Sequence, residues 1–441
     1  MDYESISMRD ENKYGKWFTQ DQLTREEIAL ARKLEQNTGP KTCLRCGADY
    51  EEIGRLPNQT YYCRACILLG RLRSDQALYY FPQKRFPEQS YLKWQGQLST
   101  WQEKISTALQ KQVENGRPSL VHAVTGAGKT EMIYQTIDTI LKQGGAVCLA
   151  SPRVDVCIEL YQRLQKDFTC PISLLHGESA DYFRTPLVIA TTHQLLKFYQ
   201  AFDLLIIDEV DAFPYVDNPI LYQAVDNALK ENGVRVFLTA TATDRLDKMV
   251  RNGQLERLSL PRRFHGNPLV IPTPIWLGSL EASIKKTCLP TKLMKAILMQ
   301  QATGFPLLLF VAEIERGRQV QEILEKEFGK GSVGCVSSQT SDRLDQVQAF
   351  REGKITILIS TTILERGVTF PGVDVFVLES HHQLFTKSSL VQISGRVGRS
   401  MDRADGLLYF FHNGKTKAMQ SAIKEIREMN KEAKDDQLPS L

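Results

Sequence analysis

The feature that most constrains the fold is a repeated alternation of short apolar runs with longer amphipathic stretches. Apolar runs of this length, each followed by a helical stretch or a turn, are typical of buried strands in a parallel sheet. Two successive sets of such runs predict two α/β domains in tandem. The first set is SLVHAV, AVCLAS, PLVIATT, DLLIID and VRVFLTA, and the second is PLLLFVA, SVGCVSS, ITILIST, VDVFVLES and GLLYFF.

The segment between the two sets has a different composition. Residues 260–274 (LPRRFHGNPLVIPTP) contain four prolines, which favour an extended connector over a helix. We therefore expect one α/β domain over residues 86–258, a linker over 259–290 and a second α/β domain over 291–441. Residues 1–40 predict a polar extension, partly helical and partly disordered, and residues 41–85 a small cysteine module. The tail from residue 415 predicts a solvated helix without chemistry.

Length and composition restrict the class of protein. A chain of 441 residues with 42% apolar and 24% charged residues is typical of a globular protein of several domains. The apolar run FPLLLFVA at 305–312 is far shorter than the roughly 18–20 residues that cross a bilayer. The first residues, MDYESISMRDENK, do not resemble a secretion signal. We predict a cytoplasmic protein without a transmembrane segment, which would be peripheral to a membrane only through a partner.

A glycine-rich segment nearly matches a phosphate-binding loop. Residues 123–130 (AVTGAGKT) fit Gly-x-x-x-x-Gly-Lys-Ser/Thr except that Ala123 replaces the first glycine. Phosphate is held by backbone N–H groups, a helix N-terminus and the lysine, so Ala123 is compatible with the pattern. Lys129 would reach the β- and γ-phosphates, and Thr130 would ligate Mg²⁺. Alone, the segment also fits a turn that binds nothing. The expected nucleotide cradle is Thr125, Gly126, Ala127, Gly128, Lys129 and Thr130.

A pair of carboxylates supports the nucleotide site. In FDLLIIDEVDAFP, Asp208 and Glu209 come at the end of an apolar strand, about 80 residues after the loop. A strand terminus is where a carboxylate can meet Mg²⁺ beside such a loop. Asp208 would hold the metal through water, and Glu209 would orient and deprotonate the attacking water. Together with Lys129 and Thr130, the pair predicts an ATPase.

Four motifs in this order resemble those of superfamily-2 helicases of the DEAD/DEAH-like group: AVTGAGKTE, DEVD, TAT at 239–241 and QISGRVGR at 392–399. The resemblance covers residues 90–411 and accounts for Ala123, because the first motif of that group typically begins with alanine. It implies two RecA-like domains with ATP in the cleft between them. Gln102 is similar to the glutamine that recognises adenine. Arg396 and Arg399 resemble arginine fingers that stabilise the transferring phosphoryl group, and Gln392 would contact the γ-phosphate or its water.

The same resemblance implies a nucleic acid that lies across both domains and is held mainly through its phosphates. Hydroxyl and backbone N–H groups after strands suit such contacts, although each turn also fits ordinary loop chemistry. Thr239 and Thr241 would link the nucleotide and nucleic-acid sites. The candidate contacts are Pro152, Arg153, Thr191, Thr192, Thr361, Thr362 and Arg366, the last beside Glu365 and Gly367.

Cysteines form a module of their own. CLRCGADYEEIGRLPNQTYYCRAC places Cys43, Cys46, Cys63 and Cys66 in a C-x₂-C-x₁₆-C-x₂-C pattern, which is typical of a structural tetrahedral Zn²⁺ site. Two disulfides are the alternative. The other five cysteines are expected to be buried or inert. Residues 41–85 carry eight Lys/Arg and four Asp/Glu, with Tyr50, Tyr61, Tyr62, Tyr79, Tyr80 and Phe81 between them. This mixture suits single-stranded DNA, a docked protein or a small core around zinc.

A four-cysteine module ahead of TGAGKTE, DEVDAFP and LPRRFHGNPL resembles the ComFA family of late-competence ATPases over nearly the whole chain. The resemblance implies an ATP-driven translocase of single-stranded DNA at the inner face of the membrane. Its implied cofactors are ATP, Mg²⁺ and Zn²⁺, and its implied protein partners are ComFC and the channel ComEC. Two alternatives stay open. One is a PriA-like replication-restart helicase, although PriA carries its cysteine clusters inside the second motor domain. The other is an ATP-switched scaffold that moves no DNA.

Overall fold

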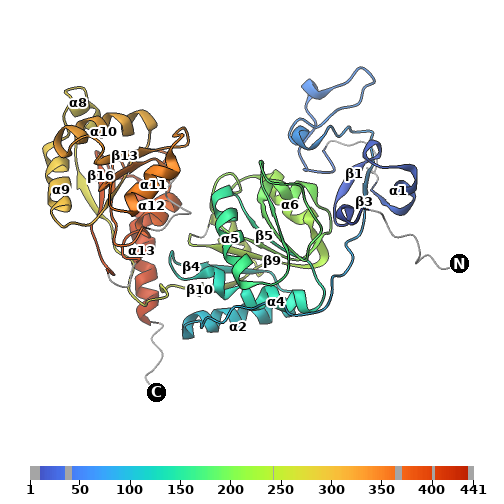
Figure 1. Cartoon of the computed structure of the whole chain (residues 1–441). Coiled ribbons are helices and arrows are strands. Elements are labelled where there is room, and N and C mark those ends of the chain that lie inside the picture. Colours follow the sequence, from blue (N-terminus) through green and yellow to red (C-terminus); the bar gives the residue numbers. More distant parts are fainter. Residues whose placement is uncertain (1–9, 35–41, 242, 363–369, 400–402, 436–441) are drawn as a thin grey trace. The chain divides into compact units, whose positions relative to one another are not determined.

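A computed structural model describes residues 10–34, 42–241, 243–362, 370–399 and 403–435 (Figure 1). The chain folds into two compact units. The first comprises Met1–His122 with Lys129–Ser259, and the second comprises Ala123–Gly128 with Leu260–Leu441. Each unit is built around one sheet of the kind that the sequence predicts.

The first sheet has seven strands in the order β10-β4-β9-β8-β5-β7-β6. Each neighbouring pair in that order, from β4·β9 to β7·β6, is parallel. The five apolar runs of the first set all form strands, as predicted. Two further strands, β6 and β10, were not predicted, and β10 is largely exposed. The strands are β4 (Ser119–Ala123), β5 (Val147–Ser151), β6 (Ile172–Leu175), β7 (Leu187–Thr191), β8 (Phe202–Ile207), β9 (Leu229–Thr239) and β10 (Glu256–Leu260).

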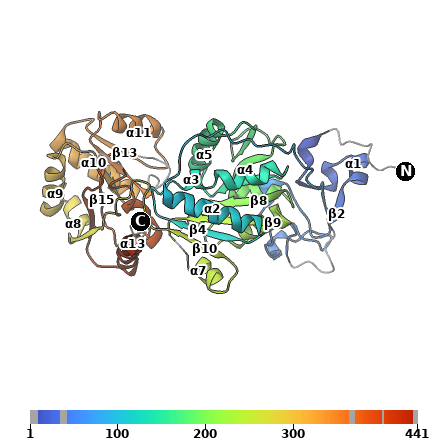
Figure 2. The same ribbon diagram turned by 90° about the horizontal axis from the view of Figure 1, so that it is seen from below.

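Helices cover this sheet, and Figure 2 shows α2 and α4 lying over one side of it. Every residue of β4, β5 and β7 is buried, which explains why these strands read as continuous apolar runs and not as alternating ones. Ser99 begins α2 with a capping box, and Asn218 caps α6. The helices are α2 (Thr100–Glu114), α3 (Lys129–Met132), α4 (Tyr134–Lys142), α5 (Val154–Asp167), α6 (Pro219–Ala228) and α7 (Asp244–Arg251).

The second sheet has six parallel strands in the order β11-β16-β15-β12-β14-β13. Its five predicted strands are present. The sixth, β11, lies inside the predicted linker and contains Pro274, which is tolerated because β11 is an edge strand. The strands are β11 (Thr273–Trp276), β12 (Leu307–Phe310), β13 (Val333–Val336), β14 (Ile357–Ser360), β15 (Asp374–Val377) and β16 (Leu408–His412).

The tail forms a helix, as the sequence predicts, but one face of it is packed and not solvated. Met419, Ala422, Ile426 and Met429 of α13 are buried at helical spacing, so one face of the helix contributes to the core. Its opposite face carries the charged residues. The helices of this unit are α8 (Leu280–Ile284), α9 (Thr291–Gln301), α10 (Ile314–Phe328), α11 (Arg343–Arg351), α12 (Lys387–Ser394) and α13 (Lys417–Asp435).

Within the first unit, a small antiparallel sheet in the order β1-β3-β2 joins the N-terminal segment to the cysteine module. Its middle strand comes from the predicted cysteine module and its outer strands from the predicted extension, so the two segments fold together. The Trp17 indole donates a hydrogen bond to the Leu196 carbonyl (2.8 Å) and stacks on Tyr199 (5.1 Å). The elements are η1 (Glu11–Lys13), β1 (Trp17–Thr19), η2 (Gln20–Gln22), α1 (Arg25–Leu30), β2 (Arg32–Leu34) and β3 (Leu78–Tyr80).

Within the described residues, none of the helices combines the length and the apolar character that crossing a bilayer requires.

Candidate nucleotide site and metal centre

The glycine-rich loop leaves β4 and ends where α3 begins at Lys129. Gly126 and Gly128 have φ angles of 81° and 72°, a region that glycine adopts without the steric cost that a Cβ brings. Ala123 needs no such freedom because it is the last residue of the strand. The Thr125 hydroxyl is buried and has no hydrogen-bond partner in the described part of the chain. A loop with a free buried hydroxyl and a lysine at the helix start fits a bound phosphate.

The carboxylates follow β8, as predicted. Lys129 Nζ lies 4.0 Å from Asp208 Oδ1, and only 19% and 14% of the two side chains are exposed. The Glu209 N–H donates to Asp208 Oδ1 (2.8 Å), and Glu209 has a φ of 55°, which turns the chain sharply after the strand. An amine and a carboxylate held this close are suited to a Mg²⁺-triphosphate, in which the lysine binds phosphate oxygens and the carboxylate binds the metal. The structure therefore brings Lys129, Asp208 and Glu209 together, and their roles stay predictions.

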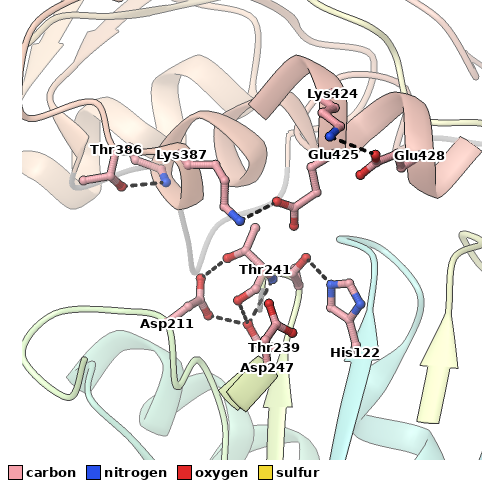
Figure 3. Close-up of polar contacts among 12 residues, drawn as sticks. His122, Asp211, Thr239, Thr241, Asp247, Thr386, Lys387, Lys424, Glu425 and Glu428 are labelled. Carbon is pink, nitrogen blue, oxygen red and sulfur yellow. Dashed lines mark hydrogen bonds and ion pairs between the residues drawn. The ribbon is translucent and has the colours of Figure 1, made fainter. Parts of the chain in front are cut away.

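A third acidic residue has a function that the sequence did not predict. Asp211, the last residue of DEVD, accepts hydrogen bonds from the hydroxyls of Thr239 (2.7 Å) and Thr241 (2.5 Å), and all three residues are buried (Figure 3). The Thr241 N–H also donates to the Thr239 hydroxyl (3.0 Å). This network joins the carboxylate turn to the end of β9, and a role of the two threonines in linking the nucleotide and nucleic-acid sites stays a prediction. In the sequence, the signal for this residue was the second aspartate of the DEVD motif, at its fourth position.

Gln102, the predicted adenine contact, is occupied in capping its own helix. Its side-chain oxygen accepts the Ser99 N–H (2.9 Å), and the Gln102 N–H faces the Ser99 hydroxyl (3.4 Å). The side chain is held in one orientation and is 7% exposed. Adenine recognition by Gln102 stays a prediction.

In the second unit, the predicted Gln392, Arg396 and Arg399 lie on and after α12. Gln392 and Arg396 are buried, and the Arg399 Nε donates to the Gly395 carbonyl (3.0 Å). Arg263 holds the same turn, because its guanidinium donates to the carbonyls of Gly398 and Gly395.

Arg263 was missed by sequence reasoning, although it stands in the segment LPRRFHGNPL. Burial and the neighbouring Arg399 lower the pKa of Arg263 to about 10, so it stays charged at neutral pH. Two cations beside one turn repel each other, which favours an anion near them.

The turn-bearing helix is also anchored to the C-terminal helix. Lys387, the first residue of α12, pairs with Glu425 of α13 (2.8 Å), as Figure 3 shows. Thr386 caps α12 by accepting the Ser389 N–H (3.1 Å). The helix that carries Gln392 is thus fixed at its start by an ion pair and a cap.

The candidate nucleic-acid residues differ in how available they are. The Arg153 guanidinium is paired with both oxygens of Asp155 (3.1 Å each) next to Pro152, so phosphate would compete with that carboxylate. Thr191 ends β7, and Thr192 begins η5 (Thr192–Lys197) with its side chain fully buried. Thr361 and Thr362 follow β14 and are partly exposed. Arg366, with Glu365 and Gly367, lies outside the described residues. These contacts remain predictions.

The four motif cysteines converge on one point. Their sulfur atoms all lie within 4.8 Å of one another and are buried, with Cys43 Sγ 3.8 Å from Cys66 Sγ and Cys46 Sγ 3.5 Å from Cys63 Sγ. Two thiolates each about 2.3 Å from a tetrahedral zinc ion are separated by about 3.8 Å. A disulfide requires about 2.05 Å, and all four cysteines are free. The arrangement fits a structural Zn²⁺ and not the disulfide alternative.

An arginine completes the surroundings of the cluster. The Arg45 guanidinium donates to Cys66 Sγ from Nε (3.3 Å) and from Nη2 (3.2 Å), and to the Leu69 carbonyl (2.9 Å). Leu69 ends η4 (Ile67–Leu69), and η3 (Glu52–Gly54) lies earlier in the module. Donors to a ligating sulfur orient it and offset the charge of four thiolates.

The cluster is also docked on the first unit. Its cysteines belong to the same core as Leu221, Ala224 and Val225 of α6. The Asn227 amide of that helix donates to the Arg45 carbonyl (3.1 Å). The metal module is therefore a fixed part of the unit whose carboxylate turn precedes α6.

The aromatic residues of the module do not form one stacking surface. Tyr79, Tyr80 and Phe81 are buried in and after β3, so they cannot stack on bases, which excludes these three from the DNA-stacking alternative and leaves them a core role. Tyr50, Tyr61 and Tyr62 are partly exposed. Tyr80 instead belongs to the main core of the first unit, and Phe81 forms a small buried cluster with Tyr14.

The remaining cysteines are mostly inert, as predicted. Burial raises the pKa of Cys157 and of Cys170 to about 12, and that of Cys335 to about 11. Cys148 is fully buried, and burial raises its pKa as well. Cys288 is the exception to burial because it is exposed.

Replacing Cys43 with serine should abolish stoichiometric zinc binding and lower the melting temperature of the first unit. Three thiolates hold the ion far less tightly, and the binding free energy of a structural metal is folding free energy. Elemental analysis and thermal unfolding measure the two effects. Cys288→Ser is the matched control, since that thiol is exposed and outside the cluster. A full equivalent of zinc in Cys43→Ser would contradict the four-thiolate site.

Comparison with known proteins agrees with this geometry. The DEAD/DEAH box helicase family matches residues 99–249, and the helicase conserved C-terminal domain matches residues 289–401. The chain is 63% identical over 422 residues to Competence protein ComFA of Streptococcus pneumoniae. The aligned residues cover 95% of this chain and 98% of that protein. The chain belongs to the ComFA family.

A second ComFA, from Bacillus subtilis, is 40% identical over 420 residues, or 91% of this chain and 88% of that protein. The solved structure of S. cerevisiae Dbp5 bound to RNA and ADP BeF3 is 19% identical, has a TM-score of 0.52 and covers 75% of this chain and 91% of that chain. This likeness confirms the predicted fold of two tandem RecA-like domains. This member of the ComFA family is an ATP-hydrolysing, helicase-like enzyme of superfamily 2.

Proposed function

We propose that the chain is an ATP-driven translocase of single-stranded DNA that draws the incoming strand into the cell during natural transformation. The observation that carries this proposal is the identity to Competence protein ComFA over nearly the full length of both proteins. The juxtaposition of Lys129 and Asp208 supports the ATPase part, because it supplies a phosphate-binding cation beside a metal-binding carboxylate.

In this mechanism the chain's own residues position the triphosphate and the attacking water. Lys129 binds the terminal phosphates, and Thr130 with Asp208 would hold Mg²⁺, which supplies charge neutralisation when bound. Glu209 takes the proton of the attacking water. The network of Asp211, Thr239 and Thr241 would pass a change at the carboxylate turn to the end of β9. Arg396 and Arg399 would stabilise charge on the γ-phosphate, so that hydrolysis depends on the second unit.

The cysteine cluster would hold a structural zinc ion in this motor. Four buried sulfurs leave no open position for catalysis, and docking on α6 makes the cluster a support of the first unit. By family resemblance, the protein partners would be ComFC and the channel ComEC, at the inner face of the membrane.

ATP hydrolysis measured against a panel of polymers tests the proposal. We expect single-stranded DNA to stimulate turnover at least about 10-fold more than RNA or duplex DNA of equal length, because a strand-translocating motor must couple its cycle to that substrate. Stimulation by a protein partner alone would contradict the translocase and favour the ATP-switched scaffold. Equal stimulation by RNA would contradict the DNA assignment.

A further inference from the structure

A groove of about 430 Å³ lies between α13 and the edge strand β11 in the second unit. Its floor is apolar, with Pro274 from β11 and Met419 and Ile423 from α13. The described residues that line it include none of those that the motifs assign to nucleotide or nucleic acid. Its chemistry is therefore separate from the site already described.

Positive charge follows the groove. Lys415, Lys424, Arg427 and Lys431 line it, and Glu428 is the single acidic residue among the described side chains at its walls. Lys424 is paired with Glu428 (3.6 Å), but both side chains are well exposed, so the pair is weak. In the part of the chain that the structure describes, Lys415, Arg427 and Lys431 form no ion pair. The groove thus offers cations that the described residues of the unit do not neutralise.

The spacing of these residues suits an extended polyanion. From Met419 to Lys431 the lining residues recur along one stripe of α13, which rises about 18 Å over that distance. At about 3.4 Å per nucleotide this stripe matches roughly five phosphates of a helically stacked strand, and fewer of a stretched one. The stripe stays in place because the Asn430 side chain bonds both the N–H and the carbonyl of Leu269 (2.8 Å each).

An exposed aromatic ring lies on β11, the strand that contributes Pro274 to the groove. Trp276 is 57% exposed and lies two residues after Pro274, so the two side chains share one face of β11. Its ring packs edge-on against His412 (6.1 Å), whose strand leads to Lys415. More than half of Trp276 is exposed, so a face of the indole is accessible for stacking on a base. Cations beside a stacking ring are the features that recognise single-stranded nucleic acid without sequence preference.

We propose that the groove between α13 and β11 binds single-stranded DNA, with phosphates along Lys415, Lys424, Arg427 and Lys431 and a base on Trp276. This inference rests on the proposed function and adds a binding surface outside the helicase motifs. Because α13 is also tied to α12 through Glu425 and Lys387, a strand in the groove contacts the helix that supports Gln392 and the arginine turn.

The test is binding of a fluorescent thymidine oligomer of about 20 nucleotides to the full chain over a range of salt concentrations. The variant Lys424→Gln/Arg427→Gln/Lys431→Gln should bind about 10- to 100-fold more weakly at about 0.1 M salt. Its slope of log affinity against log salt should be shallower by about 2, since each phosphate contact contributes about 0.7 on single strands. Lys286→Gln/Lys292→Gln/Lys295→Gln removes as much exposed charge around α9 and should leave both quantities unchanged.

Tryptophan emission gives a second readout. Of the four tryptophans, Trp276 alone is exposed, so DNA should quench part of the emission of the native chain and little of that of Trp276→Leu. Trp276→Leu should also weaken binding at least about fivefold through lost stacking. If the triple variant binds DNA with the affinity and salt slope of the native chain, the groove does not bind DNA and is left as a protein-docking face. That result would overturn this inference but not the proposed function. Absence of DNA binding by the native chain would overturn the proposed function as well.

Discussion

Replacing Lys129 with alanine should reduce ATP hydrolysis by about 10³-fold, equivalent to about 4 kcal/mol of transition-state stabilisation. The amine belongs to the first residue of α3, directly after a loop that contains two positive-φ glycines. It is also the cation that faces Asp208 at 4.0 Å. Alanine removes the charge that binds the β- and γ-phosphates and leaves the carboxylate without its neighbour. ATP affinity should therefore fall together with turnover.

Steady-state phosphate release, with and without single-stranded DNA, measures this effect. Lys111→Ala is the matched control, because Lys111 lies on the exposed side of α2 and outside the loop. That variant should hydrolyse ATP at the native rate. A thermal unfolding curve shows whether Lys129→Ala keeps its fold. Native turnover by a folded Lys129→Ala protein would remove the phosphate site from this loop.

Most of the strands that the sequence predicted are largely buried. Runs such as those that form β5 and β12 consist of apolar residues because helices cover both sides of a parallel sheet, and this pattern is visible in the letters alone. The same logic explains the failures. β11 lies at an edge of the sheet and contains Pro274, so its composition resembles that of a linker. It nevertheless pairs with β16. Edge position is a property of the folded sheet, and local composition does not encode it.

The short strands of the N-terminal segment were not predicted for a related reason. Its strands are three residues long, and Trp17–Thr19 and Arg32–Leu34 meet only through Leu78–Tyr80, which is more than 40 residues distant in sequence. Such non-local pairing leaves no periodic signal. The buried aromatics of β3 then resemble a stacking surface in the sequence, although they fill a core.

Residues that touch a ligand were easier to predict than residues that position others. Lys129, Asp208 and the four cysteines stand in patterns that their chemistry requires, and the structure brings each set together. Asp211 and Arg263 act on hydroxyls and backbone carbonyls of the protein itself. Those partners become neighbours only when the chain folds, so a motif can mark Asp211 as acidic but does not show what either residue contacts.

Replacing Arg399 with alanine should lower turnover by about 10³-fold while ATP binding is largely retained. The Arg399 Nε is fixed on the Gly395 carbonyl (3.0 Å), and Arg263 anchors the same turn through the carbonyls of Gly395 and Gly398. A guanidinium held in this way can meet developing charge on the γ-phosphate without reorganisation, which is where such a group contributes most. It contributes little to the ground-state complex, so binding and catalysis should separate.

Single-turnover hydrolysis and equilibrium binding of a fluorescent ATP analogue measure the two quantities independently. Arg399→Lys keeps the charge but loses the planar fork of donors, and should recover only part of the rate. Arg318→Ala, on the exposed face of α10, removes one guanidinium from the same unit and should change neither quantity. Loss of ATP binding with intact turnover at saturation would assign Arg399 to nucleotide affinity and not to the transition state. The native rate in Arg399→Ala would transfer the role to Arg396, whose buried guanidinium lies on the same turn.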